Sequence, residues 1–510
     1  MKNSNFIGLP FSGQISLFKD VDKDNYNKQI LIPEGYKGFS AFHKYWGKKP
    51  VEYLVFLIEI LTVPGEIILD PFLGSGLIVR EAVSRGRNFI GIDINPISVE
   101  MAVLSLDLPL LSSFKEAIEQ MHIEVRPEIE KTYKMKDSRI ATHYLWEGDS
   151  LKSVWIAGRG KGKRQEIKPD NHDLDNLAKH YNYQSEFIRE IKLFQNSRIN
   201  TFKGMTTREI FTGRALFNID LLLEYINSQP EQLRRALLLS LTAASGQMSK
   251  MVFAITGRGK TNGVRSDKIE VGSWVIGYWR PKLHFEINVW NCFINRALKL
   301  QKLLSDLKKP PHIRIVNDLD PLIGNCETTA CIIGSDARVK MNEIKDESVS
   351  LVLTDPPHSD RIPYLELSEL WNSIIGSESD FTKEIVVSNA KGRNKTKSVY
   401  SNEMKNFFSE AIRVTKKGGF IAFLFNARDE LSWSYLKDFK ELSEGIEYVG
   451  YFPMAYSANS VVQDNRKGGL KNDYILIYQK NTSTCSSTNH LSILNHLPGW
   501  SISFPTLKGD

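Results

Sequence analysis

Apolar residues in the first hundred positions alternate between helical spacing and short continuous runs. Helical spacing over 51–61 predicts an amphipathic helix, and the apolar run at 66–72 (EIILDPF) predicts a buried strand. A glycine-rich turn then leads into a predicted helix over 77–85, and a second strand is expected over 88–94 (NFIGIDI). Strand, helix and strand in this order form a βαβ unit, which implies a parallel sheet.

This alternation of strand and helix patterns weakens after residue 110 and returns near residue 330. The later elements predicted are strands, one helix and two final strands that could pair antiparallel, in the order 330–334, 348–354, 407–415 (helix), 420–425, 447–452 and 473–478. Between the two α/β stretches, helical patterns cover 221–244 and 285–304. The simplest organisation is one α/β domain interrupted by an insertion of about 200 residues, which should fold as a unit because long structureless loops are uncommon.

The predicted domain boundaries follow from this change of texture. Residues 36–110 and 326–480 are expected to form the α/β domain, and 111–325 a mostly helical inserted unit. A polar N-terminal segment over 1–35 precedes them. A polar tail over 481–510, rich in Ser, Thr and Asn, follows them and is expected to be loosely ordered.

Composition places the chain among soluble globular proteins. Of 510 residues, 42% are hydrophobic and 25% are charged, and no apolar run reaches the roughly 18 residues that span a bilayer. The N-terminal residues lack the pattern of a secretory signal. The four cysteines include no C-x-x-C pair, so we expect a reduced cytoplasmic protein without a disulfide scaffold or a structural metal.

The net charge of +7 is a mild bias towards polyanionic partners. Basic residues gather in three loops that also contain or adjoin glycine: Arg159, Lys161, Lys163 and Arg164; Arg258, Lys260, Arg265 and Lys268; and Lys391, Arg393, Lys395 and Lys397. Any one of these could be a solvated loop. Three of them in one chain favour contact with nucleic-acid phosphates.

The glycine turn after the first strand is typical of a nucleoside-cofactor site. Gly74 and Gly76 let the backbone approach a ligand, and the helix start that follows offers free N–H groups. Asp93, near the end of the next strand, stands where a ribose-binding carboxylate would lie. Val79 occupies the position where a dinucleotide fingerprint needs glycine, and the usual phosphate loop of ATP-binding proteins is absent.

A second motif, Asp355-Pro356-Pro357-His358, follows the strand predicted over 348–354. Its two prolines stiffen the turn and remove two N–H donors, so carbonyls remain as the free backbone groups. An aromatic amine is a poor nucleophile because its lone pair is delocalised into the ring. The Asp355 carboxylate and the Pro356 carbonyl could accept both amine hydrogens and free that lone pair for in-line attack, while His358 stacks on the base. Such a turn alone could merely shape a loop, but beside the first motif it predicts methylation of an exocyclic amine.

Together, D-P-F-x-G-x-G at 70–76 and D-P-P-H at 355–358 resemble the N4/N6 amino-methyltransferase family of DNA methylases. The resemblance covers about 42–104 and 334–478. It implies an α/β fold with the Rossmann-like sheet of class I S-adenosylmethionine-dependent methyltransferases, interrupted by the large insertion. The motif order matches the family's alpha-type arrangement, in which the insertion holds the target-recognition domain that contacts DNA.

The resemblance also implies roles for individual residues. Contacts to S-adenosylmethionine are implied for Asp70, Phe72, Gly74 and Gly76. Asp93 would bind the ribose hydroxyls of the cofactor, and Asp336 would reach its adenine. The segment FHKYWGKKP, with His43 and Trp46, resembles the element that closes over the methionine moiety. The catalytic turn would consist of Asp355, Pro356, Pro357 and His358, the last standing where the family most often has Tyr.

These inferences predict a DNA methyltransferase that acts on N6 of adenine after flipping the base out of the duplex. Asp at position 355 favours adenine, whereas Ser is commoner in the N4-cytosine enzymes, which stay an alternative. An RNA-base (tRNA) amino-methyltransferase and a catalytically dead DNA-binding module are further alternatives. No cysteine follows a proline, so the nucleophile of ring-carbon methylation is missing. Whether the enzyme works with restriction or phage-defence components stays open.

Overall fold

We describe the fold from a computed structural model of the chain. The residues it describes are 33, 35–158, 164–257, 260–261, 264–265, 268–307, 313–319, 327–426, 433, 435–436, 445–454, 473–481 and 493–505.

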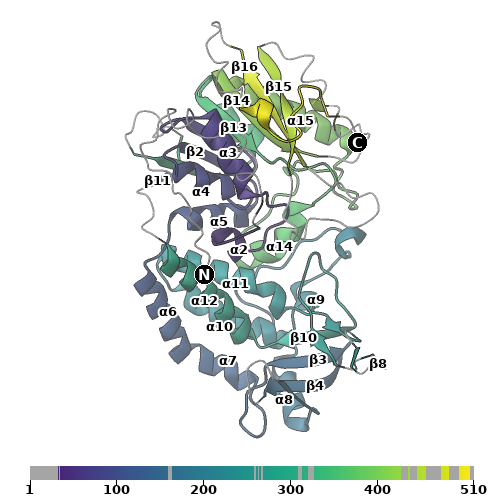
Figure 1. Cartoon of the computed structure of the whole chain (residues 1–510). Coiled ribbons are helices and arrows are strands. Elements are labelled where there is room, and N and C mark those ends of the chain that lie inside the picture. The colour runs from purple at the N-terminus through teal and green to yellow at the C-terminus, as the bar shows by residue number, and fades with distance from the viewer. Residues whose placement is uncertain are drawn as a thin grey trace.

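An eight-stranded sheet forms the upper part of the molecule in the order β11-β12-β2-β1-β13-β14-β16-β15 (Figure 1). Its strands are β1 (Ile67–Asp70), β2 (Asn88–Asp93), β11 (Arg314–Val316), β12 (Thr329–Gly334), β13 (Val349–Thr354), β14 (Thr415–Phe425), β15 (Ile446–Met454) and β16 (Asp473–Lys480). The pairings from β11 to β14 are parallel, whereas β16 runs antiparallel to both neighbours. The predicted α/β class, with a mostly parallel sheet and a late antiparallel pair, is confirmed.

Helices cover both faces of the sheet. Since successive side chains of a strand point to opposite faces, neighbouring strand residues are buried in two different cores. Ile68 in β1 packs into a core with α3 (Val51–Leu61), α4 (Leu77–Val83) and α5 (Pro96–Leu106). Its neighbour Leu69 packs into a second core with α13 (Ala337–Lys340) and α15 (Lys397–Val414). The near-continuous apolar character of the strand sequences therefore reflects burial on two sides.

The strand order reverses next to β1. From β1 the chain builds β2 on one side and, after the insertion, β13 and β14 on the other. In an open parallel sheet the carboxyl ends of the strands on either side of such a switch leave a crevice, where ligands bind.

The segment between β2 and β11 lies below the sheet in Figure 1. After α5, the α-helices described in this segment are α6 (Leu111–Glu124), α7 (Arg126–Thr132), α8 (Asn171–His180), α9 (Thr207–Ile210), α10 (Gly213–Asn227), α11 (Glu231–Met248) and α12 (Val289–Asp306). A four-stranded sheet in the order β10-β3-β4-β5 joins β3 (His143–Glu147), β4 (Ser150–Ala157), β5 (Arg164–Ile167) and β10 (Leu283–Ile287) in antiparallel pairs. Two short ribbons pair β6 (Ala254–Ile255) with β9 (Glu270–Val271), and β7 (Lys260–Thr261) with β8 (Val264–Arg265).

Two of the predicted helices differ from the structure. The pattern over 221–244 belongs to two helices, since α10 ends at Asn227 and α11 begins at Glu231 after Pro230, which cannot continue a helix. The pattern over 285–304 begins in a strand. There β10 ends at Ile287, and Asn288 caps α12 by accepting a hydrogen bond from the Asn291 backbone N–H.

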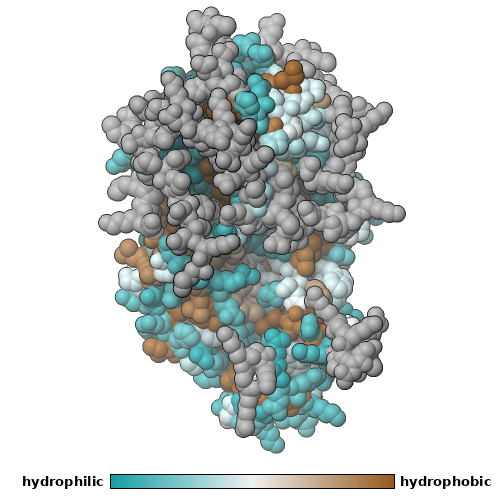
Figure 2. Space-filling view, viewed as in Figure 1, coloured by the Kyte–Doolittle hydropathy of each residue, from teal (hydrophilic) through white to brown (hydrophobic). Residues whose placement is uncertain are grey.

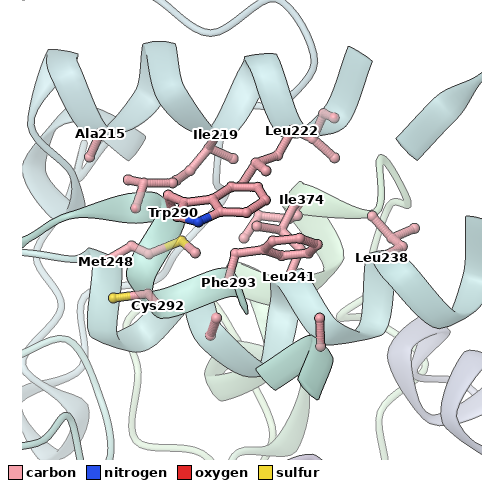
Figure 3. Close-up of a cluster of buried hydrophobic side chains, with 14 of the residues drawn as sticks. Ala215, Ile219, Leu222, Leu238, Leu241, Met248, Trp290, Cys292, Phe293 and Ile374 are labelled. Carbon is pink, nitrogen blue, oxygen red and sulfur yellow. The ribbon is translucent and has the colours of Figure 1, made fainter. Parts of the chain in front are cut away.

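One hydrophobic core joins the helices of the insertion to the helix that follows the D-P-P-H turn. Figure 3 shows side chains of α10, α11 and α12 packed around Trp290 and Phe293, with Ile374 of α14 (Tyr364–Ile374) among them. On the same helix, the Trp371 ring stacks on Trp46 with centroids 4.6 Å apart. The inserted unit and the site-bearing domain thus share apolar packing.

Part of the C-terminal segment is packed against the sheet domain. Leu494 and Leu497 are buried in the same core as α3, and the Trp500 ring lies 6.3 Å from that of Phe452. Residues 493–505 therefore differ from the loosely ordered polar tail expected over 481–510, because their apolar side chains fill the sheet's edge. The polar segment expected over 1–35 lies almost wholly outside the described residues.

Hydrophobic and hydrophilic residues intermingle over the lower part of the face shown in Figure 2. Leu110 and Ile123 are each 70% exposed, as single side chains of this kind often are. In the part of the chain that the structure describes, no helix is both long and apolar enough to cross a membrane.

Gly76 is the N-cap of α4. Its φ of 72° lies in the left-handed region, and a Cβ added there would lie 2.8 Å from the Ala102 Cα. We expect Gly76→Ala to lower the free energy of unfolding by roughly 2–4 kcal/mol, because overpacking adds to backbone strain. Gly376→Ala is the control, since Gly376 has φ 75° and open space around it, and should lose only about 1–2 kcal/mol. Urea unfolding of both variants measures the difference, and equal losses would refute the packing argument.

Candidate active site

A cavity of about 940 Å³, open to solvent, lies at the carboxyl end of the sheet where the strand order reverses. Parallel pairing brings the carboxyl ends of β12, β2, β1 and β13 together at this edge. Four carboxylates at or just beyond those ends line the cavity: Asp336, Asp93, Asp70 and Asp355. Motifs far apart in the sequence therefore meet in one site.

Asp70, the last residue of β1, is 1% exposed and lies in the cavity wall. Its Oδ1 accepts the Phe72 backbone N–H at 3.1 Å and the Thr354 hydroxyl at 2.7 Å. Burial raises the pKa of the Asp70 carboxyl to about 8, and the hydrogen bonds only partly oppose this rise. Among the described residues no cation pairs with it, so this carboxylate is suited to a positively charged ligand.

Asp93, the last residue of β2, organises the glycine turn. Its Oδ2 accepts the Gly74 backbone N–H at 2.7 Å, and its Oδ1 accepts the Asn95 backbone N–H at 2.8 Å. Burial raises the pKa of Asp93 to about 6 despite these bonds. Each carboxylate oxygen keeps a further lone pair, so Asp93 can still accept from ligand hydroxyls. Asp336, next along the sheet edge, lines the cavity and pairs with Arg338 at 2.6 Å.

The hydrogen bond from Thr354 to Asp70 links the two sequence motifs directly. Thr354 ends β13, which pairs with β1, and its hydroxyl is fully buried. Asp355 follows it, and its side chain is 21% exposed at the cavity. Pro356 is buried, and within the described residues nothing donates a hydrogen bond to its carbonyl; Pro357 lines the cavity, and its carbonyl accepts the Tyr400 hydroxyl at 2.7 Å.

The segment before α3 forms another wall of the cavity. Trp46 and Lys49 line it, together with Tyr45, whose ring stacks on Tyr364 with centroids 5.8 Å apart. The Lys49 ammonium lies 3.1 Å from Asp355 Oδ1 and 2.5 Å from Asp473 Oδ2. Through Lys49, the segment before α3 is thereby attached to the D-P-P-H turn.

His358 does not lie where stacking on a base requires. Its ring is 6% exposed beneath the turn and does not line the cavity. The Nε2 atom lies 2.9 Å from Asp355 Oδ1 and 3.2 Å from the Leu424 carbonyl oxygen, and Nδ1 lies 2.9 Å from Arg361 Nη1. The expected stacking role of His358 is therefore corrected, because its two ring nitrogens find partners under the turn.

Two residues expected at the cofactor are also placed elsewhere. His43 is 3% exposed, and its Nε2 lies 3.0 Å from the Thr242 hydroxyl, inside the core shared with α11. Burial lowers the pKa of His43 to about 3, so it is a neutral packing residue. Gly76 does not line the cavity; its lack of a side chain instead lets α4 approach Ala102 of α5. Phe72 and Gly74 lie in the cavity wall.

Only one of the three basic loops is fully described, and half of its cations point inwards. The side chain of Arg393 is 1% exposed and pairs with Glu384 at 2.5 Å, and that of Lys395 is 7% exposed and pairs with Glu403 at 3.1 Å. The structure therefore contradicts the expected contact of Arg393 and Lys395 with phosphates, since the charge of each is compensated by a carboxylate inside the protein. Residues 159–163 and the side chains of 258–267 lie outside the described part.

Several residues of the site were not singled out from the sequence. Lys49 lies within FHKYWGKKP and Tyr364 lies six positions after the D-P-P-H turn, so proximity to a motif could have indicated them. Asp473 is 118 positions beyond Asp355 and begins β16 without any local signal. Only the antiparallel pairing of β16 with β14 brings it to the turn.

The described geometry is that of an α/β protein with an acid-lined cavity and a D-P-P turn at the switch point of its sheet. Residues 14–104 match a family model described as DNA methylase, of the N6/N4 type, which confirms the predicted family over that segment.

Similar curated proteins are methyltransferases. Over 61 residues the chain is 41% identical to DNA adenine methyltransferase YhdJ of Escherichia coli (strain K12), covering 12% of this chain and 21% of YhdJ. Over another 61-residue alignment it is 39% identical to Type II methyltransferase M.BglI of Bacillus subtilis, covering 12% and 18%. The chain thus spans about a fifth of the length of these relatives. The crystal structure of PH0851 aligns with 37% of this chain and 40% of that chain at 12% identity and a TM-score of 0.18, which supports no argument.

The raised pKa of Asp70 makes the stability of the ligand-free protein depend on pH. Between its unfolded value of 3.8 and about 8, the unfolded chain ionises this carboxyl while the fold keeps it protonated. Stability should therefore fall by roughly 1.4 kcal/mol per pH unit from this group as the pH rises through that window. Asp70→Asn, which keeps the acceptor oxygen, should raise the melting temperature at pH 8 and not at pH 4.

Asp175→Asn, at an exposed position of α8, is the matched control and should leave the pH dependence unchanged. Differential scanning calorimetry from pH 4 to 8 measures all three proteins. A melting-temperature difference for Asp70→Asn that stays constant with pH would contradict the burial argument.

Proposed function

We propose that this protein is an S-adenosylmethionine-dependent DNA methyltransferase that acts on the exocyclic N6 amino group of adenine. The observation that carries the proposal is the hydrogen bond from Thr354, the residue before the second motif, to Asp70 of the first. Asp70 ends β1 and Asp355 follows the end of the neighbouring strand β13, and both line one cavity. A cofactor held at the first carboxylate and a base held at the second would therefore be close enough to react.

The charges of the cavity fit S-adenosylmethionine better than a phosphate-bearing nucleotide. Asp70, Asp93 and Asp336 line it, and the ammonium of Lys48, which also lines it, is turned to the carbonyls of Ser40 and His43 at 2.8 and 2.6 Å. A phosphate would face these carboxylates, whereas an ammonium or sulfonium would compensate the buried charge of Asp70. Bound S-adenosylmethionine would supply an electrophilic methyl group on a sulfonium.

In this proposal Asp70 holds the cationic methionine end, with Phe72, Gly74 and Trp46 around it, and Asp93 accepts from the ribose hydroxyls. Asp336 lies further along the edge and would meet the cofactor's adenine. The strand order β12-β2-β1 supports this sequence of contacts, because it arranges the three carboxylates in a row. The sheet would then be the Rossmann-like sheet of the class I methyltransferases.

The target amine is proposed to lie between the Asp355 carboxylate and the Pro356 carbonyl. Both can accept its hydrogens, which frees the nitrogen lone pair for in-line attack. Because His358 is buried, Tyr364 is proposed as the aromatic residue that stacks on the flipped base. It lines the same cavity, and burial and the nearby Asp355 charge raise the pKa of its hydroxyl. A duplex base reaches this depth only after it leaves the stack.

The inserted residues 111–325 are proposed as the DNA-reading unit. They share a hydrophobic core with α14, which begins nine residues after Asp355 at Tyr364, so their position relative to the turn is fixed by packing. Of the basic residues in this segment, Arg164 is exposed on β5, the edge strand of the four-stranded sheet. Phosphate contacts are proposed for exposed cations of this kind and not for Arg393 or Lys395.

Adenine is proposed on the Asp at position 355 and on the similarity to a relative named as a DNA adenine methyltransferase. Hydrolysis of methylated DNA to nucleosides tests the base, and N4-methylcytosine without N6-methyladenine would assign the N4-cytosine alternative. Tritium transfer with DNA and tRNA offered side by side tests the nucleic acid. A protein that binds DNA and cofactor without turnover would be the dead binding module.

We expect Asp355→Ala to reduce methyl transfer by at least about 100-fold while leaving the cofactor affinity within about twofold, because the carboxylate contacts the amine and not the cofactor. Asp70→Asn should show the opposite pattern, with cofactor affinity reduced roughly tenfold or more. Isothermal titration with S-adenosylmethionine and single-turnover transfer separate the two effects. Loss of cofactor binding in Asp355→Ala would show that Asp355 contacts the cofactor and would contradict its proposed contact with the target amine.

A further inference from the structure

The Asp355 carboxylate is held by one oxygen only. Its Oδ1 lies 2.9 Å from His358 Nε2 and 3.1 Å from Lys49 Nζ. No contact within the described part of the chain engages Oδ2, although the side chain is mostly buried and lines the cavity. Two donors on one oxygen fix the rotation of the carboxylate and leave its second oxygen for a ligand.

The hydrogen-bond partners of His358 settle which nitrogen carries its proton. A guanidinium has no acceptor, so at the 2.9 Å contact with Arg361 Nη1 the His358 Nδ1 must accept. The proton of the neutral ring therefore sits on Nε2, which donates to Asp355 Oδ1. Burial and the nearby Lys49 charge lower the pKa of His358, in agreement with a neutral ring.

Asp473 keeps the two cations of this group in place. Its Oδ2 lies 2.5 Å from Lys49 Nζ and its Oδ1 lies 2.9 Å from Arg361 Nη1. The carboxylate is 1% exposed. Burial would raise the pKa of Asp473, but Lys49, His358 and Arg361 together bring it well below its ordinary value. Asp473, at the start of β16, thus compensates the charges of Lys49 and Arg361. The Asp355 carboxylate is therefore not needed as the partner of either cation and can stay at the cavity.

We propose that His358 is a positioning residue: its Nε2–H, together with Lys49, holds Oδ1 of Asp355 so that Oδ2 faces the target amine. Arg361 fixes the tautomer that makes this donation possible, and Asp473 fixes Arg361. The inference rests on the proposed function and adds a task for His358, which belongs to the catalytic turn but does not line the cavity. A phenyl ring at position 358 would stack but would have no hydrogen-bond donor to offer Asp355.

Three substitutions separate positioning from stacking and from packing. His358→Leu should lower the single-turnover rate by roughly 30- to 100-fold, since a carboxylate that is free to rotate misplaces the acceptor. The Km for DNA and the affinity for S-adenosylmethionine should change less than about threefold. His358→Gln, whose amide can donate to Oδ1, should recover the rate to within about tenfold of wild type. His496→Leu, at an exposed site in the C-terminal segment, is the matched control.

His358→Phe provides the test against stacking. Phe restores an aromatic ring and carries no hydrogen-bond donor, so its rate should fall as far as that of His358→Leu. A Phe variant as active as wild type would overturn the proposal, and so would a Gln variant as slow as Leu. In Asp355→Ala, adding His358→Leu should cost less than about threefold more, because the two residues act through one carboxylate.

Failure of the proposed function is recognised separately. If the wild-type protein transfers no methyl group to any nucleic acid, both the function and the positioning role are rejected. If wild type is active and His358→Leu keeps its rate, only the positioning role is rejected. Melting temperatures of all variants accompany the rates, and a variant that fails to fold is replaced by His358→Gln, whose rate decides the question.

Discussion

The buried carboxylate of Asp473 is the contact on which the geometry of the site depends. It binds Lys49 from the segment before α3 and Arg361 from the segment after the D-P-P-H turn, and these in turn contact Asp355 and His358. Charges taken out of water are tolerated only when each has a partner, and removing one leaves the others uncompensated. Asp473 therefore ties the N-terminal wall, the turn and the sheet edge into one arrangement, although 424 positions separate it from Lys49.

The sheet contributes a second constraint, which places a carboxylate at each of four neighbouring strand ends. Desolvation makes two of them, Asp70 and Asp93, costly in the ligand-free protein, and the raised pKa of each expresses that cost. A fold that retains such a group without a cation of its own gives up stability at a binding site. The same desolvation strengthens the attraction to a cationic ligand, because charges interact more strongly where water is excluded. Burial of the Asp70 carboxylate thus lowers the stability of the ligand-free fold and strengthens the binding of a cationic ligand.

Much of the sheet domain could be predicted because its signals are local. Strands buried on both faces are continuous apolar runs, and the turns at 74–76 and 355–358 are defined by two glycines or two prolines close together in the sequence. The predictions that failed depended on tertiary contacts. His43 contacts Thr242, 199 positions away, and His358 contacts the Leu424 carbonyl, 66 positions away. Arg393 is nearer in sequence to its partner Glu384, but the pair is buried only in the folded protein. Residues 493–505 were expected to belong to a tail because the last 30 residues are rich in Ser, Thr and Asn, yet Leu494 and Leu497 are buried against the sheet domain.

The sequence alone determined the α/β class, the two motifs and the family of the segment over 14–104, since each rests on neighbouring residues. It also indicated that a long insertion separates the motifs. Only the tertiary structure decided which side chains meet. Parallel pairing of β1 with β13 brings Asp70 to Thr354, and antiparallel pairing of β16 with β14 brings Asp473 to the turn. Contacts between residues more than a hundred positions apart depend on strand order and packing, which local residue patterns do not encode.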